Sequence, residues 1–410
     1  MAHSLSLETK APASGLFSQP ELFGSSDRTF HAYVHVPFCT ARCGYCDFNT
    51  YTALELGSLK QSDFAKSLIS EIVFSGEALR TSKAPDRNLS TVFFGGGTPT
   101  LLPATDLVSM LNALETEFGF DRDVEITFEA NPDTVTKEKL ALLREAGFNR
   151  VSIGMQSAVP EVLAVLDRTH NPDNVAAAVE IAKELGFQTS LDLIYGAPTE
   201  TLSQWESSIK QAIDLDPGHV SAYSLIVEDG TKLARQISSG ELPRPDEDLQ
   251  AEKYELTDAL LAKAGYQWYE ISNWSKSSQL RSRHNLAYWS SQDWWGYGPG
   301  AHSHLGSVRW WNQKHPLTYS TKLVKFLSPA SGREQLNVST AALERVLLES
   351  RTATGISIAD LKALNSGSQL VISELISDGL IDGRSAVSGQ LQLTLRGRLL
   401  ADAVVRKLTA

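Results

Sequence analysis

Short apolar runs alternate with longer amphipathic segments over the first half of the chain. Runs rich in β-branched and aromatic residues predict six strands, at residues 32–36, 91–94, 124–128, 150–154, 189–195 and 220–227. Apolar residues spaced three or four apart predict helices between them, at residues 63–74, 106–118, 137–146, 174–185 and 204–213. This alternation indicates an α/β fold with a parallel sheet. Six such units fit a partial (β/α)6 barrel better than a closed eightfold barrel.

Three predicted helices end with the same signal. Gly147, Gly186 and Gly265 each follow a helical segment and precede an aromatic residue. Glycine adopts the left-handed conformation that ends a helix, and the aromatic residue after it can pack on the last turn. We therefore expect a sharp helix-to-strand turn at each position.

The pattern changes twice towards the C-terminus. Residues 229–338 are less regular and contain seven of the eight tryptophans, which makes them an extension of a barrel domain at 30–228. Residues 339–410 predict helices at 341–350, 358–364 and 369–378, a turn at 382–383, a strand at 391–395 and a helix from 397. Helices followed by a small β-ribbon predict an α+β, winged-helix-like domain.

Composition and charge limit the classes of partner. The 410 residues carry a net charge of −11 without a run of Lys and Arg, so neither nucleic acid nor an anionic membrane is an expected partner. The C-terminal segment carries eight basic and seven acidic residues, which favours packing or protein docking over DNA binding. No apolar stretch approaches the roughly 20 residues that span a bilayer. Residues 1–29 lack the apolar core of a secretory signal, and we expect a disordered leader.

The three cysteines, Cys39, Cys43 and Cys46, all lie in one loop after the first predicted strand. A secreted disulfide scaffold would spread more cysteines along the chain, so we expect a reducing, cytoplasmic location. Three thiolates in the spacing C-x3-C-x2-C can hold a [4Fe-4S] cluster and leave one iron open to a chelating amine and carboxylate. A structural zinc site completed by His35, or three unrelated structural thiols, are the alternatives.

The residues around the cysteines resemble the radical SAM superfamily. Tyr33-x-His35-x-Pro37-Phe38-Cys39 and Cys43-x-Tyr45-Cys46 are similar to its coproporphyrinogen-oxidase-like branch. The resemblance implies a [4Fe-4S] cluster on the three cysteines and S-adenosylmethionine on its open iron. It also implies a set of cofactor contacts at the carboxyl ends of the strands and on the helix after the fourth strand: Tyr33, Tyr45, Gly96, Gly97, Thr98, Glu129, Gln156, Arg168 and Asp192. Each of these alone is more often structural.

Two members of that branch compete. The oxygen-independent coproporphyrinogen dehydrogenases continue with C-x-C after the third cysteine, whereas this chain has Phe48 at that position. The segment from His284 to Trp289 matches the H-N-x-x-Y-W motif of the HemW-type haem chaperones. That resemblance implies haem binding by His284, Asn285, Tyr288 and Trp289. His302 or His304 is a candidate second ligand, and the alternative for His284 is a buried, hydrogen-bonded histidine.

We therefore expect a haem chaperone that binds the cluster, S-adenosylmethionine and haem, and delivers haem to apo-haemoproteins. It would meet a membrane only through a partner. A radical enzyme acting on a porphyrin is the first alternative. A DNA-binding regulator with an iron–sulfur sensor rests on the C-terminal segment alone.

Overall fold

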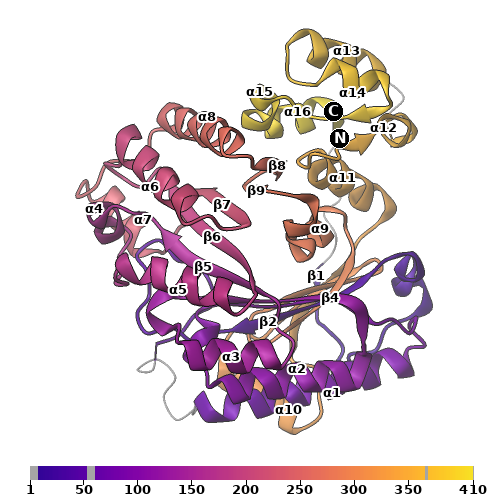
Figure 1. Ribbon diagram of the computed structural model, residues 1–410. Coiled ribbons are helices and arrows are strands. Elements are labelled where there is room, and N and C mark those ends of the chain that lie inside the picture. Colours follow the sequence, from indigo (N-terminus) through magenta and orange to yellow (C-terminus); the bar gives the residue numbers. More distant parts are fainter. Residues whose placement is uncertain (1–7, 53–60, 365–367, 410) are drawn as a thin grey trace.

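Thirteen strands form one continuous sheet in the computed structural model, which describes residues 8–52, 61–364 and 368–409 (Figure 1). In spatial order the strands are β1 (Glu8–Thr9), β13 (Ala330–Gln335), β12 (Val308–Asn312), β11 (His302–Leu305), β10 (Asp293–Tyr297), β2 (Phe30–Val36), β3 (Leu89–Gly96), β4 (Phe120–Ala130), β5 (Arg150–Gln156), β6 (Gln188–Tyr195), β7 (His219–Ser224), β9 (Asn273–Ser275) and β8 (Gln267–Glu270).

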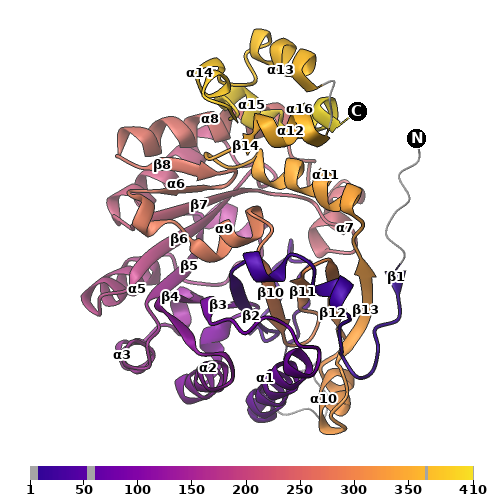
Figure 2. The ribbon, with the colours of Figure 1, turned by 90° about the vertical axis from the view of Figure 1, so that its right-hand side faces the viewer.

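The six predicted strands correspond to β2–β7, which are adjacent and parallel, so the partial barrel is confirmed. The five predicted helices are also present, with ends shifted by a few residues. They are α1 (Phe64–Thr81), α2 (Ala104–Phe118), α3 (Lys137–Glu145), α5 (Asp173–Glu184) and α6 (Leu202–Asp214). Helices α1, α2, α3 and α5 cover the outer face of the curved sheet, whereas α9 lies inside the curve (Figure 2).

The structure contains further elements that the pattern did not delimit, although the end of α8 matches the turn predicted at Gly265. The further helices before residue 338 are α4 (Pro160–Val165), α7 (Lys232–Ser238), α8 (Glu247–Lys263), α9 (Arg283–Trp289) and α10 (Pro316–Val324). The 3-10 helices are η1 (Gln19–Leu22), η2 (Ser25–Asp27), η3 (Gln61–Asp63), η4 (Pro99–Leu101), η5 (Pro132–Thr134) and η6 (Ser278–Leu280).

The two faces of the parallel strands differ in chemistry. In β2, Ala32, Val34 and Val36 are fully buried on the helix-covered face. His31 and Tyr33 alternate with them and therefore point into the barrel, because successive side chains of a strand lie on opposite faces. The neighbouring strands keep this alternation, so the barrel interior is lined by polar side chains rather than by an apolar core.

The predicted glycine turns are confirmed. Gly147, Gly186 and Gly265 have φ values of 105°, 77° and 88°, which L-residues with a side chain rarely adopt. Phe148 and Phe187 follow two of these glycines and are buried in the main core. These turns fix the direction from which β5 and β6 enter the sheet.

The tryptophan-rich extension is more regular than its pattern indicated. Its strands β10–β13 continue the sheet beyond β2, and β10 runs parallel to β2. Trp295 and Trp310 are buried on the outer face, where both rings contact Phe17. Trp294 occupies the opposite face of β10, which continues the barrel interior. The paired tryptophans hid the strand alternation because both faces of the hairpin are aromatic.

The disordered leader expected at residues 1–29 is wrong for residues 8–29. Strand β1 pairs with β13, and Leu22 and Phe17 pack on the main core. Ser18 and Glu21 cap η1 reciprocally. The segment is ordered because these apolar side chains cover the outer face of β10–β13. Residues 1–7 lie outside the described residues.

The C-terminal part has its own core, separate from that of the barrel. Its elements are α11 (Val338–Glu349), β14 (Ile356–Ser357), α12 (Ile358–Leu364), α13 (Ser368–Ser377), α14 (Gly383–Val387), β15 (Gln390–Leu391), α15 (Leu395–Leu399) and α16 (Ala401–Thr409). The ribbon β14–β15 is shorter than the strand predicted at 391–395, because the Thr394 side chain caps α15 and ends the extended segment. Residue 383 begins α14 rather than lying in a simple turn.

One buried carboxylate, Glu71 on α1, joins the barrel to the hairpin extension. Its Oε2 accepts hydrogen bonds from the Gly298 amide at 2.8 Å and the Tyr319 hydroxyl at 2.5 Å. Its Oε1 accepts one from Asn312 Nδ2 at 2.7 Å. Burial raises the pKa of Glu71 to about 7. The outer helix α1 is therefore tied to the turn after β10, to β12 and to α10 through one side chain.

We predict that Glu71→Ala lowers the free energy of unfolding in urea by about 3 kcal/mol, because it leaves several buried donors without an acceptor. Glu77→Ala, an exposed carboxylate on the same helix, should change it by less than about 0.5 kcal/mol. Equal stabilities of the two variants would show that Glu71 does not join these elements.

Candidate functional site

Three adjoining cavities occupy the concave side of the sheet. The cluster cavity, of about 600 Å³, contains the three cysteines and the carboxyl ends of β3–β6. The barrel cavity, of about 170 Å³, lies between the strands and α9 and is lined by Arg150, Asp192, His219 and His284. The hairpin cavity, of about 1010 Å³, lies against β10–β12 and is lined by Tyr288, Trp294, His302 and Lys314. Glu129 and Asp192 line both the cluster and barrel cavities.

The cysteine loop is held in place by backbone hydrogen bonds. The Cys39 amide donates to the Tyr51 carbonyl at 3.1 Å, and the Cys46 amide donates to the Cys43 carbonyl at 3.2 Å. Gly44 donates to the Leu166 carbonyl at 3.3 Å. These bonds connect the loop to the segment that follows it and to the segment after α4, and the three thiols face one cavity.

The chemistry of the thiols suits a metal cluster. Burial raises the pKa of Cys39 to about 11 and also raises the pKa of Cys46. Such thiols lose their protons when they bind a metal ion. Arg168 Nη1 lies 3.6 Å from Cys43 Sγ, where its charge can balance thiolates. In the described part of the chain, no three His, Cys, Asp or Glu side chains surround a single point; the thiolates of a cluster each bind a different iron.

The zinc site that His35 would complete does not form. His35 Nδ1 is hydrogen-bonded to the Tyr33 hydroxyl at 3.1 Å, and its Nε2 to the Asn49 carbonyl at 2.9 Å. Both ring nitrogens are therefore engaged within the protein.

The glycine loop after β3 approaches the cysteine loop closely. The Gly97 amide donates to the Val36 carbonyl at 2.7 Å, and the Thr98 amide to the Phe38 carbonyl at 2.8 Å. A Cβ at Gly97 would lie 2.5 Å from the Phe38 carbonyl oxygen, so only glycine fits there. Gly96, Gly97 and Thr98 all line the cluster cavity.

The strand-end residues converge on the same cavity, as the sequence predicts. Glu129 Oε2 accepts the Gly96 amide at 3.0 Å, and Asp192 Oδ2 accepts the Ser152 hydroxyl at 2.7 Å. Burial, followed by the nearby charge of Asp192, raises the pKa of Glu129 to about 8. Gln156 has a φ of 63°, an uncommon conformation for a residue with a side chain.

Arg168 lines the cluster cavity from the loop after α4, not from a helix as expected. The helix ends at Val165 and the chain turns at Leu166 and Asp167. The Nε of Arg168 is buried without a hydrogen-bond partner. A buried, unpaired donor on a residue that lines this cavity fits a site built for a ligand.

The two predicted tyrosines lie in different places. Tyr45 lines the cluster cavity beside the cysteines. Tyr33 lines the barrel and hairpin cavities instead, and its ring stacks on Phe93 with centroids 6.2 Å apart.

The predicted haem motif forms α9, inside the curve of the sheet. His284 is 1% exposed, and burial lowers its pKa well below the ordinary value. Its Nδ1 is hydrogen-bonded to Thr91 Oγ1 at 2.6 Å and its Nε2 to the Tyr288 hydroxyl at 2.9 Å. Asn285 lines the barrel cavity, and Trp289 donates to Glu270. Of the four motif residues, Tyr288 alone lines the hairpin cavity.

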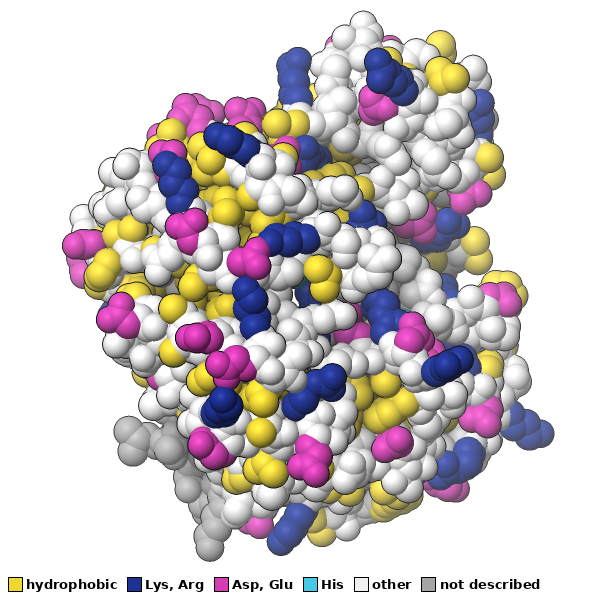
Figure 3. Space-filling model, viewed as in Figure 1, with side chains coloured by type: hydrophobic (Ala, Val, Ile, Leu, Met, Phe, Trp, Pro, Cys, Tyr) yellow, Lys and Arg dark blue, Asp and Glu magenta, His cyan; other side chains and the backbone are white. Residues whose placement is uncertain are grey.

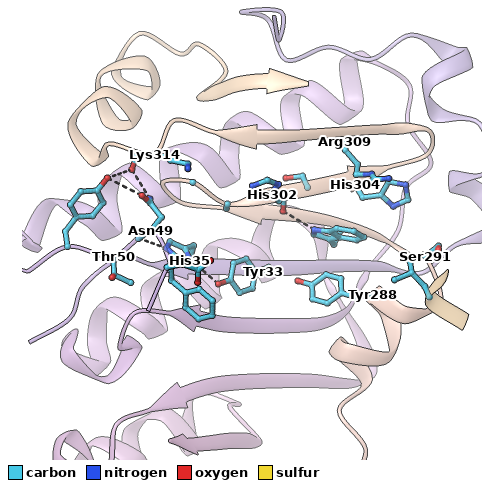
Figure 4. Close-up of a pocket in the computed structure, with 18 of the residues that line it drawn as sticks. Tyr33, His35, Asn49, Thr50, Tyr288, Ser291, His302, His304, Arg309 and Lys314 are labelled. Atoms are coloured by element: carbon cyan, nitrogen blue, oxygen red, sulfur yellow. Dashed lines mark hydrogen bonds between the residues drawn. The ribbon is translucent and has the colours of Figure 1, made fainter. Parts of the chain in front are cut away.

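The hairpin cavity combines aromatic surface with positive charge. Figure 4 shows Tyr33 and Tyr288 on one side, with His302, His304 and Arg309 on the strands above them and Lys314 at one end. Cross-strand pairing places His302 beside Trp311 and His304 beside Arg309. Sequence analysis missed Trp294, Arg309 and Lys314 because only the pairing of β10–β12 brings them to this cavity. It also missed Arg42, which reaches the cavity from the cysteine loop.

The charges on the outer surface do not gather into a patch of one sign on the face shown in Figure 3. On the face shown in Figure 3, acidic and basic side chains are interspersed, with apolar side chains between them. Across the described residues, no helix combines the length and apolar character that a bilayer crossing demands.

Comparison with known proteins identifies the class. The family model described as Radical SAM superfamily matches residues 33–212. The coproporphyrinogen III oxidase HemN of Escherichia coli has the same fold, with a TM-score of 0.79 and 23% identity over 97% of this chain and 95% of that one. The partial barrel and its cysteine loop are thus those of a radical SAM protein.

Closer relatives define the family within that class. A protein of Mycobacterium tuberculosis named heme chaperone HemW is 44% identical over 95% of this chain and 97% of its own length. The heme chaperone HemW of Bacillus subtilis is 34% identical over 91% of this chain and 97% of its own length. The chain belongs to the HemW family of radical SAM proteins. Membership of the superfamily implies a [4Fe-4S] cluster and S-adenosylmethionine.

We predict that pH controls the affinity for S-adenosylmethionine through Glu129, once the cluster has been reconstituted without oxygen. A cationic sulfonium favours the carboxylate, which forms as the pH rises through about 8. The dissociation constant should therefore fall, by up to about tenfold per pH unit below that value. Equilibrium dialysis at pH 6.5 to 8.5 measures it.

Glu129→Gln should remove most of this pH dependence, whereas Glu138→Gln, an exposed carboxylate on α3, should retain it. An unchanged pH profile in Glu129→Gln would exclude Glu129 from the cofactor site.

Proposed function

We propose that this protein is a haem chaperone that binds a [4Fe-4S] cluster, S-adenosylmethionine and haem, and delivers haem to apo-haemoproteins. One observation carries the proposal: 44% identity over 95% of the chain to a protein named heme chaperone HemW. Identity over nearly the full length covers the cysteine loop, α9, the hairpin and the C-terminal elements together.

The cluster cavity supports the first part of the proposal. Cys39, Cys43 and Cys46 would hold the cluster, whose open iron would bind the amino and carboxylate groups of S-adenosylmethionine. Gly96, Gly97 and Thr98 would present backbone groups to that molecule, while Arg168 balances the thiolates. Tyr45, Gln156, Glu129 and Asp192 would complete its surroundings.

The hairpin cavity supports the haem site. Its volume of about 1010 Å³ lies at the upper end of the range for small-molecule and cofactor pockets. Tyr33, Tyr288 and Trp294 provide aromatic surface for a flat macrocycle, and Lys314 and Arg42 provide positive charge for its carboxylates. Arg309 is already paired with Glu344, which lines the same cavity. Arg42 and Phe48 also line the cluster cavity, so the cysteine loop separates the two ligands.

Phe48 distinguishes this function from porphyrin decarboxylation. Its side chain is 60% exposed at the boundary of the two cavities, at the position where the enzyme branch has a fourth cysteine. A phenyl ring there provides neither a thiolate nor a proton.

We predict that the anaerobically reconstituted protein binds haem and transfers it to an apo-haemoprotein, but forms no protoporphyrinogen from coproporphyrinogen, S-adenosylmethionine and a reductant. Absorption of the acceptor reports transfer, and chromatography reports both the tetrapyrrole product and 5′-deoxyadenosine. Protein denatured before the assay provides the control for passive release of haem. Rapid protoporphyrinogen formation would instead identify an enzyme.

A further inference from the structure

A chain of hydrogen bonds connects the protein surface to the hairpin cavity through two buried histidines. Thr29 Oγ1, on an exposed residue, lies 2.8 Å from His31 Nε2, and His31 Nδ1 lies 2.8 Å from Thr91 Oγ1. Thr91 Oγ1 lies 2.6 Å from His284 Nδ1, and His284 Nε2 lies 2.9 Å from the Tyr288 hydroxyl. Every member of the chain can both donate and accept a proton.

The outer end of this hydrogen-bond chain fixes which atom donates at every step. Gln292 Nε2 donates to the Ser290 carbonyl at 3.0 Å, which leaves Gln292 Oε1 as the acceptor for the Thr29 hydroxyl at 3.0 Å. Thr29 must then accept from His31 Nε2, and His31 Nδ1 must accept from Thr91. Thr91 in turn accepts from His284 Nδ1, so His284 Nε2 accepts the proton of Tyr288.

With the protons donated in this direction, His284 and Tyr288 differ in their ability to bind a ligand. Both ring nitrogens of His284 are occupied, and the side chain is 1% exposed. The hydroxyl proton of Tyr288 is directed at His284, so lone pairs of its oxygen remain for a ligand in the cavities that Tyr288 lines. Tyrosine oxygen is a known type of haem-iron ligand.

We propose that the oxygen of Tyr288 is the iron ligand of ferric haem in the hairpin cavity, and that His284 is the positioning residue that accepts its proton. The proposal rests on the haem binding proposed above. It assigns the two residues of the motif different tasks, which their spacing of four on α9 permits because they share one face of the helix.

The exchange of ligands balances without a change of oxidation state. The O–H bond of Tyr288 breaks, an iron–oxygen bond forms, and a water ligand of the incoming ferric haem is released. The proton passes to His284 Nε2, while the Nδ1 proton of His284 moves to Thr91. Thr91 passes its own hydroxyl proton to His31 Nδ1, and His31 Nε2 passes its proton to Thr29. Thr29 then releases its hydroxyl proton to solvent. Both histidines remain neutral and exchange tautomers.

The surroundings of Tyr288 favour a bound macrocycle over a free phenolate. Trp294 meets its ring edge to face, with centroids 4.7 Å apart. Burial, and then the charge of Glu129, raises the pKa of Tyr288, so an iron cation is needed to displace the proton. Charged or titratable groups face this chain from β2, β4, β5, β6, β7, α9 and β10–β12: His31, Tyr33, Glu125, Glu129, Arg150, Asp192, His219, Arg283, Asp293, His304 and Arg309.

The test is a titration of Tyr288→Phe with ferric haem, followed by absorption and resonance Raman spectroscopy. The wild-type complex should show phenolate-to-iron charge-transfer bands. Tyr288→Phe should lose them and bind at least tenfold more weakly, while its ring still contacts Trp294. Metal-free protoporphyrin should bind both proteins equally. Tyr266→Phe, which removes a buried hydroxyl outside the three cavities, is the matched control and should behave as wild type.

The role of His284 has its own spectroscopic test. His284→Gln should retain the charge-transfer bands at a shifted wavelength, because the hydrogen bond to the phenolate changes. Between pH 5.5 and 7, wild-type affinity should rise about tenfold per pH unit for the one proton released. Tyr288→Phe should lack that dependence. An unshifted band in His284→Gln would overturn the positioning role.

The outcomes separate the two proposals. Wild-type protein that fails to bind ferric haem would overturn the proposed function and this assignment together. Haem binding that persists unchanged in spectrum and affinity in Tyr288→Phe would overturn only the assignment. In that case, loss of binding in His302→Ala would identify the exposed imidazole of the hairpin as the ligand.

Discussion

The alternation of side chains along the parallel strands is the constraint on which this architecture depends. In β2, alanine and valine face the helices while histidine and tyrosine face the barrel interior. A shift of one residue in strand pairing would place imidazoles against the helices and valines in the cavities. Pairing with β3 and β10 therefore sets the fold and the chemistry of the interior at the same time. The apolar contacts of the outer face stabilise a polar inner face that could not stabilise itself.

Much of the parallel barrel could be predicted from local patterns. Strand and helix periodicity located β2–β7 and their helices, and the three cysteines marked the loop that Gly97 approaches. Strand ends were enough to place Glu129, Gln156 and Asp192 near one another, because parallel strands finish at a common edge.

What could not be predicted depends on contacts between distant segments. Thr91 and His284 are 193 positions apart, and the sequence contains no sign that one binds the other. Strands β10–β12 lack polar alternation because each pair of tryptophans places one indole on either face. The surroundings of Tyr33 were unpredictable for a related reason: its strand position was clear, but the cavities it lines are closed by α9 and the hairpin.

The arrangement of the cysteine loop has a consequence for communication between ligands. Arg42, Asp47, Phe48 and Thr50 line both the cluster cavity and the hairpin cavity, so one short loop forms a shared wall. A molecule that pushes this wall from either side changes the space left on the other. Should a guest in one compartment displace this wall, the coupling would be reciprocal, so that each guest would alter the retention of its neighbour by the same factor.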